Sequence, residues 1–267
     1  MNSVRWGDAN SDPYKLQCGV RQGGLTSPLL FNLYMNDLME ELSSAAVGCH
    51  VAGVCANNFS YADDMVLLSP SITGLRILVS ICERYAANHG LKYNVTKSEL
   101  IVFKYDKGPD NVPPVRLNGT ELKFVNNFKY LGHFLTDRLK DDDDLERQRR
   151  SIAMRSNMLA RRFAHCSDQA KITLFKAYCQ AFYTSQLWYH FTKRSFNRLR
   201  VQYNNAFRAM LRLPWRCSAS GMFAENRVDD FYAIMRKRHW SFVGRVSEST
   251  NSIVNVVYTT CYCLLIQ

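Results

Sequence analysis

The sequence predicts an α+β protein whose first half alternates strands and helices and whose second half is mainly helical. Three observations support this expectation. Turn signals separate short apolar runs in the first half, apolar residues recur at helical spacing in the second, and 47% of the 267 residues are hydrophobic. A chain of this length and composition can bury a sizeable core, which argues against a disordered protein.

The first expected helix follows a glycine-rich loop. This loop contains Arg21, Gln22, Gly23 and Gly24, and Ser27-Pro28 then supplies an N-cap and a first helical residue. The apolar positions that follow at helical spacing are Leu30, Leu33, Tyr34, Leu38 and Leu42. Glycines let the backbone approach a flat ligand, Arg21 can contact phosphate, and Gln22 can hydrogen-bond a base or a sugar. An ordinary loop explains the same residues equally well.

Two adjacent carboxylates, Asp63 and Asp64, follow Tyr61 between two strand-like runs, residues 54–60 and 65–69. We expect a β-hairpin with the two acids at its turn. Like charges held this close repel by roughly 1 to 4 kcal/mol at surface dielectrics. A bound Mg²⁺ or Mn²⁺ ion would offset that cost, because hard cations prefer oxygen ligands. The alternative is a solvated Asp-Asp turn.

A helix and a second hairpin are expected next. Ser71 can cap this helix and Gly90 can end it. The shared apolar face consists of Leu75, Leu78, Val79, Cys82 and Ala86. The dipeptide Asn118-Gly119 between residues 115–117 and 120–125 is a strong hairpin signal.

The second half begins with four consecutive acids, Asp141 to Asp144, and we place a domain boundary between residues 1–139 and 140–267. Four consecutive carboxylates point in different directions, so we expect a solvated helix start that favours the helix dipole, and no metal site. The helix that follows should expose a basic face that includes Arg150, Arg155 and Arg162 and could contact phosphates. A surface helix with incidental arginines fits the same pattern.

Aromatic residues in the rest of the chain are expected to lie mainly in the core, including Trp188, Tyr189, Trp215 and Trp240. The apolar residues beyond about residue 248 suggest an edge strand, or a sequence reached after a frame or splice change.

The chain is basic, with a formal net charge of +11 and a pI near 9.3. This favours a polyanionic partner such as nucleic acid, although a basic surface without a dedicated ligand is the alternative. The nine cysteines lack zinc-site spacing and are expected to be free thiols in a reducing compartment. We find neither a signal-peptide pattern nor a membrane-spanning run. An intracellular location, cytoplasmic or nuclear, is therefore expected, with no membrane partner.

Taken in order, four motifs resemble the palm of reverse transcriptases from non-LTR (LINE-like) retrotransposons. They are the glycine-rich loop with Ser27-Pro28, the Tyr61-Ala62-Asp63-Asp64 turn, the segment 90–94 followed by Lys97-Ser98-Glu99 and a strand at 100–103, and Phe128-Lys129-Tyr130-Leu131-Gly132. The resemblance covers residues 16–136. It implies a partial polymerase palm, an antiparallel sheet packed with helices, followed by a mainly helical, thumb-like region.

The resemblance also implies two-metal nucleotidyl transfer, with Mg²⁺ or Mn²⁺ as cofactor and an RNA template, a DNA primer or target DNA and a dNTP as partners. Asp63 and Asp64 would bind metal and act in catalysis, and Lys97 would assist proton transfer to pyrophosphate unless it is a solvated strand-end lysine. The residues that would contact nucleotide or nucleic acid are Arg21, Gln22, Gly23, Gly24, Tyr61, Tyr130, Leu131, Gly132, Arg150, Arg155 and Arg162.

One departure from the family pattern changes the expected activity. The family's other metal-binding aspartate lies on a strand before the glycine-rich loop, whereas Asp8 and Asp12 lie in a turn-like stretch. We therefore expect an N-terminally truncated polymerase without this aspartate and without fingers. Autonomous activity should then be reduced by orders of magnitude. The alternatives are a non-catalytic nucleic-acid-binding remnant and an unstable product of a decayed element.

Overall fold

The computed structural model describes residues 2–15, 19, 23–104 and 111–265, with side chains described up to residue 260. The chain forms two compact units, residues 1–93 with 115–120 and residues 94–114 with 121–267. The polypeptide therefore passes from one unit to the other at three points, after Tyr93, Pro114 and Thr120. The boundary predicted at residue 140 lies within the second unit, at the start of a helix. The predicted division into a partial palm, residues 1–139, and a helical thumb-like region, residues 140–267, stays a prediction.

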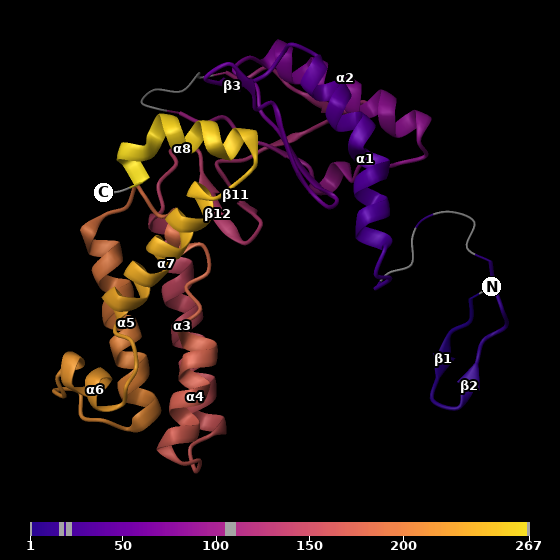
Figure 1. Cartoon of the computed structure of the whole chain (residues 1–267). Helices are drawn as coiled ribbons and strands as arrows, with labels where there is room; N and C mark the ends of the chain where they lie inside the picture. The colour runs from indigo at the N-terminus through magenta and orange to yellow at the C-terminus, as the bar shows by residue number, and fades with distance from the viewer. Residues whose placement is uncertain (1, 16–18, 20–22, 105–110, 266–267) are drawn as a thin grey trace. The chain divides into compact units, whose positions relative to one another are not determined.

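Two helices, α1 (Ser27–Ser44) and α2 (Ile72–Asn88), build the core of the first unit (Figure 1). The side chains that meet between them are at most 6% exposed: Leu38, Leu42, Leu78, Ile81, Cys82 and Tyr85. Burying an apolar side chain of this size contributes about 1.5–3 kcal/mol. The predicted apolar face of α2 is therefore confirmed. The predicted face of α1 is buried only at Leu38 and Leu42, whereas Leu30, Leu33 and Tyr34 are 49%, 71% and 42% exposed.

The predicted helix ends agree with the structure closely but not completely. The Ser71 hydroxyl accepts a hydrogen bond from the Gly74 amide at 3.1 Å, which confirms the cap of α2. The first helix begins one residue earlier than expected, so that Thr26 is the N-cap, and the Thr26 side chain makes no capping hydrogen bond. Gly90 has a φ of +65° and follows α2, as expected for a helix-ending glycine.

The strands of the first unit are short and pair two by two (Figure 1). The pairs are β1 (Arg5–Trp6) with β2 (Ala9–Asn10), β3 (His50–Val51) with β4 (Val54–Cys55), β5 (Asn58–Tyr61) with β6 (Asp64–Leu67), and β8 (Arg116–Leu117) with β9 (Thr120–Glu121). The single antiparallel sheet expected for a palm is thus replaced, among the described residues, by separate pairs.

A buried asparagine ties this β-structure to the end of α1. The Asn57 side chain is 1% exposed and donates hydrogen bonds to the carbonyls of Leu42 at 2.7 Å and Val47 at 2.9 Å. Gly48 lies against it with a φ of +103°, and a Cβ at residue 48 would come within 2.3 Å of the Asn57 Cβ. Residue 48 therefore has to be glycine.

The second unit is mainly helical, as the sequence predicts (Figure 1). Its helices are α3 (Asp142–Arg162), α4 (Asp168–Cys179), α5 (Lys193–Leu211), α6 (Ala219–Glu225), α7 (Phe231–Ser247) and α8 (Ser252–Leu265), with 3₁₀ turns η1 (Val95–Lys97) and η2 (Ser185–Leu187). Aromatic rings dominate the core. Phe175 and Phe207 are both fully buried, and their ring centroids lie 4.9 Å apart in an edge-to-face arrangement. This geometry stabilises the pair in addition to the gain from burying apolar area.

Short strands and the tail complete this unit. β7 (Glu99–Leu100) pairs in parallel with β10 (Lys123–Phe124), and β11 (Asn127–Tyr130) forms an antiparallel hairpin with β12 (His133–Thr136). The strand expected at 100–103 is thus limited to Leu100. The expected edge strand in the apolar tail is wrong, because that segment is helix α8. None of the helices in the described part of the chain is long and apolar enough to cross a membrane.

Candidate active site and nucleic-acid interface

The two adjacent carboxylates lie at the tip of the β5–β6 hairpin, as predicted. Tyr61 pairs with Asp64, so Ala62 and Asp63 form a two-residue turn, and Ala62 has a φ of +53°. A left-handed conformation costs a non-glycine residue about 1–2 kcal/mol. Tyr61, Asp63 and Asp64 are all exposed. The hairpin thus presents both acids to solvent at a strained turn.

A pocket of about 380 Å³ adjoins this turn within the first unit. Its walls come from α1, the β5–β6 hairpin and the segment after α2, with Phe31, Asn32, Met35, Asn36, Met39, Ser60, Ala62, Asp63, Met65, Leu91, Lys92 and Tyr93 as lining residues. Asp63 lines this pocket whereas Asp64 does not. The walls combine apolar side chains with a carboxylate, an ammonium group and two amides, as is typical of small-molecule sites.

The donor set at the turn fits a hard divalent cation in part. Asp63 and Asp64 offer carboxylate oxygens, which Mg²⁺ combines with water and substrate phosphate oxygens. The described residues form no group of three or more His, Cys, Asp or Glu side chains that could hold a metal ion. These residues therefore suit one Mg²⁺ ion shared with a substrate, and a pair of ions would need further oxygen ligands.

Two predicted site segments are less fully described. Arg21 and Gln22 lie outside the described residues, and Gly23, with a φ of +78°, is followed by Gly24 and the start of α1. Lys97 ends the η1 turn and is exposed. The amide of Lys97 donates to the Asn94 side chain at 3.3 Å. The roles given to these residues stay predictions.

The hairpin predicted to contact the primer end is formed by β11 and β12, with Leu131 and Gly132 at its turn. Gly132 has a φ of +83°, and a Cβ there would come within 2.6 Å of the Tyr183 ring. Glycine is therefore required both by the backbone conformation and by the close approach of Tyr183. Tyr130 is half-buried and Leu131 is 39% exposed, so the turn offers a partly apolar edge to a ligand.

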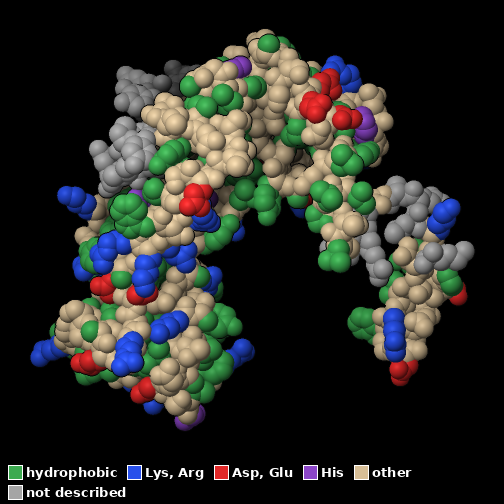
Figure 2. Space-filling view, in the orientation of Figure 1, with side chains coloured by type: hydrophobic (Ala, Val, Ile, Leu, Met, Phe, Trp, Pro, Cys, Tyr) green, Lys and Arg blue, Asp and Glu red, His purple; other side chains and the backbone are tan. Residues whose placement is uncertain are grey.

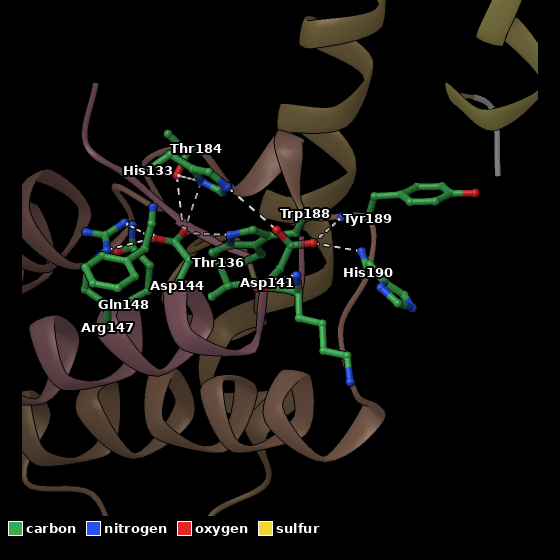
Figure 3. Close-up of polar contacts among 12 residues, drawn as sticks. His133, Thr136, Asp141, Asp144, Arg147, Gln148, Thr184, Trp188, Tyr189 and His190 are labelled. Carbon is green, nitrogen blue, oxygen red and sulfur yellow. Dashed lines mark hydrogen bonds and ion pairs between the residues drawn. The ribbon is translucent and has the colours of Figure 1, made fainter. Parts of the chain in front are cut away.

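A buried polar network holds this hairpin against α3 (Figure 3). The Asp144 carboxylate is completely buried and accepts hydrogen bonds from the Trp188 indole at 2.8 Å, the Arg147 guanidinium at 2.7 Å and the Phe134 amide at 3.2 Å. Burial alone would raise the pKa of Asp144, but hydrogen bonds led by that from His133 outweigh it and lower the pKa. Asp144 is thus kept ionised within the protein.

His133 of β12 lies between two acids (Figure 3). Its Nδ1 is 3.5 Å from Asp144 and its Nε2 is 3.7 Å from Asp141. Asp141 in turn accepts two backbone hydrogen bonds at 2.8 Å, from the amides of Tyr189 and His190. Hydrogen bonds to Asp141 and Asp144 raise the pKa of His133 to about 9, against the lowering effect of burial. His133 is therefore protonated at neutral pH.

This network corrects the expected solvated start of α3. Asp141 is only 8% exposed and Asp144 not at all, whereas Asp143 is exposed. Residues at i and i+3 share one side of a helix, so Asp141 and Asp144 can both face His133. The sequence analysis did not identify His133 or Thr184, and it expected Trp188 in the core without a polar role, although the i, i+3 spacing of the acids was a usable signal.

The predicted basic face of α3 is only partly present. Arg150 is exposed and forms an ion pair with Glu146 at 3.0 Å, while Arg162 is exposed at the last turn. Arg155 is half-buried and donates to the Tyr178 carbonyl at 3.2 Å, close to the end of α4. Arg155 therefore also stabilises a neighbouring helix end. The phosphate contacts expected of Arg150, Arg155 and Arg162 stay predictions.

The aromatic residues predicted for the core divide into two groups. Trp188 is 9% exposed and lies in the core, as expected. Tyr189, Trp215 and Trp240 are 63%, 77% and 63% exposed, so their core assignment is wrong. Each lies beside a turn or on an outer helix face, which aromatic composition alone does not reveal.

Comparison with known proteins identifies the segment that carries these motifs. Residues 4–135 match the family described as reverse transcriptase (RNA-dependent DNA polymerase). This segment belongs to the reverse transcriptase family. It contains the β5–β6 turn, Lys97 and the β11–β12 hairpin up to Leu135, whereas helices α3 to α8 follow it.

The similar curated proteins are reverse transcriptases of non-LTR retrotransposons. The Pol polyprotein of the type-2 element R2DM of Drosophila melanogaster is 34% identical over 49% of this chain and 13% of its own length. The probable RNA-directed DNA polymerase from transposon BS of Drosophila melanogaster is 28% identical over 79% of the chain and 24% of its own length. The RNA-directed DNA polymerase from mobile element jockey of Drosophila funebris is 23% identical over 75% of the chain and 22% of its own length. The chain thus spans less than a quarter of these relatives.

Proposed function

We propose that this chain is part of an RNA-directed DNA polymerase of a non-LTR retrotransposon, which copies an RNA template from a DNA primer or target DNA with dNTP substrates. The observation that supports this most directly is the exposed Asp63-Asp64 turn beside a pocket, within the reverse transcriptase segment. The proposed metal is Mg²⁺ or Mn²⁺.

In this proposal, Asp63 and Asp64 bind the metal and lie next to the reacting phosphate. A bound divalent ion would polarise the phosphoryl oxygen and lower the pKa of the attacking hydroxyl. Asp63 lines the pocket together with Lys92, whose ammonium group suits a phosphate, and with Asn32 and Asn36, whose amides can bond a sugar or base. Lys97 keeps its proposed role in proton transfer to pyrophosphate.

The second unit supplies nucleic-acid binding in the same proposal. Residues 121–267 contain 24 Lys and Arg against 12 Asp and Glu, whereas residues 1–120 contain 10 against 11. The positive charge of the chain therefore belongs to the β11–β12 hairpin and the helices after it, which suits contact with a phosphate backbone. Tyr130, Leu131 and Gly132 would contact the primer end, and Arg150 and Arg162 the backbone of the duplex.

A non-catalytic nucleic-acid-binding protein is the second candidate. The observation that favours it is the absence, among the described residues, of a third acid near the β5–β6 turn. Two carboxylates without further ligands would bind a catalytic metal pair weakly. The basic second half would keep its affinity for nucleic acid in that case.

Magnesium-dependent primer extension on an RNA template by the purified chain tests the proposal. Incorporation should fall at least about 100-fold in the double variant Asp63→Asn, Asp64→Asn, which corresponds to the loss of about 3 kcal/mol of transition-state stabilisation. Asp37→Asn is the matched control, because it removes another exposed carboxylate of the first unit. Equal incorporation by the double variant and the wild type would refute the metal role. A folded chain that binds an RNA–DNA duplex without incorporation would favour the second candidate.

A further inference from the structure

Helix α7 exposes aromatic and basic side chains along one face. Tyr232, Arg236 and Trp240 follow one another at intervals of four residues, so they lie on the same side of the helix. Tyr232 is 43% exposed and Trp240 63% exposed, and Arg236 is exposed between them. These three residues, here named the α7 stripe, contrast with the buried face of the helix, which carries Phe231 and Ile234.

Helix α5 fixes one end of the α7 stripe. The guanidinium carbon of Arg200 lies 5.7 Å from the centroid of the Tyr232 ring, within cation–π distance. The Phe196 ring packs against Tyr232 at 6.5 Å between centroids. Tyr232 is therefore held in place by two neighbours while part of its surface stays open to solvent. Arg200 brings a second positive charge next to this open ring.

The charge around the α7 stripe is positive. Together α5 and α7 contain nine Lys and Arg and no Asp or Glu. Ion pairs neutralise two of these charges, because Arg198 lies 3.7 Å from Glu146 and Lys237 lies 2.7 Å from Asp229. No carboxylate of the described residues lies within ion-pair distance of Arg200 or Arg236. In Figure 2, Lys and Arg side chains gather over the helices of this unit.

Exposed rings alternating with unpaired arginines suit a single strand of nucleic acid. Bases stack on aromatic side chains without sequence preference, and arginines contact the phosphates between them. Eight helical residues separate Tyr232 from Trp240, a rise of about 12 Å. A stacked strand advances about 3.4 Å per nucleotide, so the stripe matches about three to four nucleotides. A protein partner would leave the unpaired arginines without anionic groups unless its surface were acidic.

We propose that the α7 stripe, with Arg200, binds single-stranded nucleic acid through base stacking on Tyr232 and Trp240 and phosphate contacts to Arg236 and Arg200. This surface is distinct from the Asp63-Asp64 turn and from the α3 arginines. It needs neither a metal ion nor polymerase activity. Its presence would give the chain a site for an unpaired stretch of RNA or DNA.

Binding of a fluorescein-labelled twelve-nucleotide oligouridylate to the full chain without magnesium provides the test, because this oligonucleotide forms no duplex. Trp240→Ala should weaken its affinity by about 5- to 150-fold, as expected for one lost stacking contact. Trp215→Ala is the matched control and should change affinity less than about twofold. Trp215 is also exposed, and the guanidinium carbon of Arg216 lies 4.8 Å from the centroid of the Trp215 ring.

Three further measurements separate stacking from a general loss of structure. Trp240→Phe should recover most of the affinity, whereas Trp240→Leu should not, because only the ring stacks on a base. Oligouridylate should quench tryptophan fluorescence in the wild type and in Trp215→Ala but much less in Trp240→Phe. Affinity for an RNA–DNA duplex should change little in all four variants.

Several results would overturn the proposal. These are an affinity of Trp240→Ala equal to that of the wild type, equal losses in Trp240→Ala and Trp215→Ala, and a wild-type chain that does not bind oligouridylate at low salt. Dimerisation of the wild type through Trp240 that oligouridylate does not reverse would assign the stripe to a second copy of the chain. The Asp63→Asn, Asp64→Asn variant should bind oligouridylate normally, so failure of the polymerase proposal leaves this test intact.

Discussion

His133 should make the stability of the second unit fall as the pH rises above neutrality. The hydrogen bonds to Asp141 and Asp144 raise the pKa of His133 in the folded state to about 9, compared with about 6.5 in the unfolded chain. A folded-state pKa above the unfolded value means that the folded state binds the proton more tightly. The stabilisation is therefore complete below pH 6.5 and is lost as the pH rises through 9.

The size of this effect follows from the same pKa values. Each pKa unit corresponds to about 1.36 kcal/mol, so the protonated imidazole contributes about 3 kcal/mol at pH 5. At pH 7 most of this contribution, about 2–3 kcal/mol, remains, and at pH 9 less than about 1 kcal/mol is left. The His133 side chain is only 10% exposed, so solvent screening reduces these values little. Between pH 7 and pH 9 the free energy of unfolding should thus decrease by about 2 kcal/mol.

Urea unfolding at pH 6, 7, 8 and 9 measures this change, with tryptophan fluorescence as the signal, to which Trp188 next to Asp144 contributes. His133→Gln keeps a polar side chain but cannot be protonated, so its free energy of unfolding should be lower than that of the wild type at pH 6. This difference should shrink as the pH rises to 9. His165→Gln, which alters an exposed histidine, is the control and should follow the wild type. If the wild type and His133→Gln lost the same stability between pH 7 and 9, the linkage to His133 would be refuted.

Three further substitutions test the packing, and urea unfolding measures each. Asn57→Ala should cost about 2 kcal/mol in the first unit, because two buried carbonyls lose their hydrogen bonds; a loss below 0.5 kcal/mol would contradict this. Phe207→Ala should destabilise the second unit by about 3–5 kcal/mol through a core cavity, and an unchanged midpoint would argue against the aromatic core. Gly132→Ala should destabilise the second unit by about 1–3 kcal/mol. The loss should be smaller in a Tyr183→Ala background, because the 2.6 Å contact between the new Cβ and the Tyr183 ring is then absent. Equal losses in both backgrounds would exclude that clash.

Local turn chemistry made the hairpins and α2 predictable. Asn118-Gly119 adopts positive φ at both residues, the conformation that this dipeptide favours between strands. Ser71 caps α2 as its sequence position indicates. The acids at the β5–β6 turn were also located correctly. These features depend on residues close together in sequence, so a local pattern suffices to predict them.

Contacts between distant segments were not predictable in the same way. Asp144 is buried because Trp188, Thr184 and His133, up to 44 residues away, satisfy its oxygens. The four acids at the start of α3 do not indicate in the sequence which distant residues will contact them. Exposure of these carboxylates to solvent was therefore the natural expectation. The exposure of Trp215 and Trp240 has the same origin, because burial depends on which surfaces other helices cover.

The three passages of the chain between the units limit how the protein can be divided. A fragment that ends at Tyr93 would lose Val115 and Leu117, which are buried within the first unit. A fragment that starts at Glu121 would lose Leu100, whose strand pairs with β10. A single protease cut or a two-piece expression strategy therefore leaves at least one unit without part of its own core. Reconstitution from fragments would require pieces that overlap across residues 94–120.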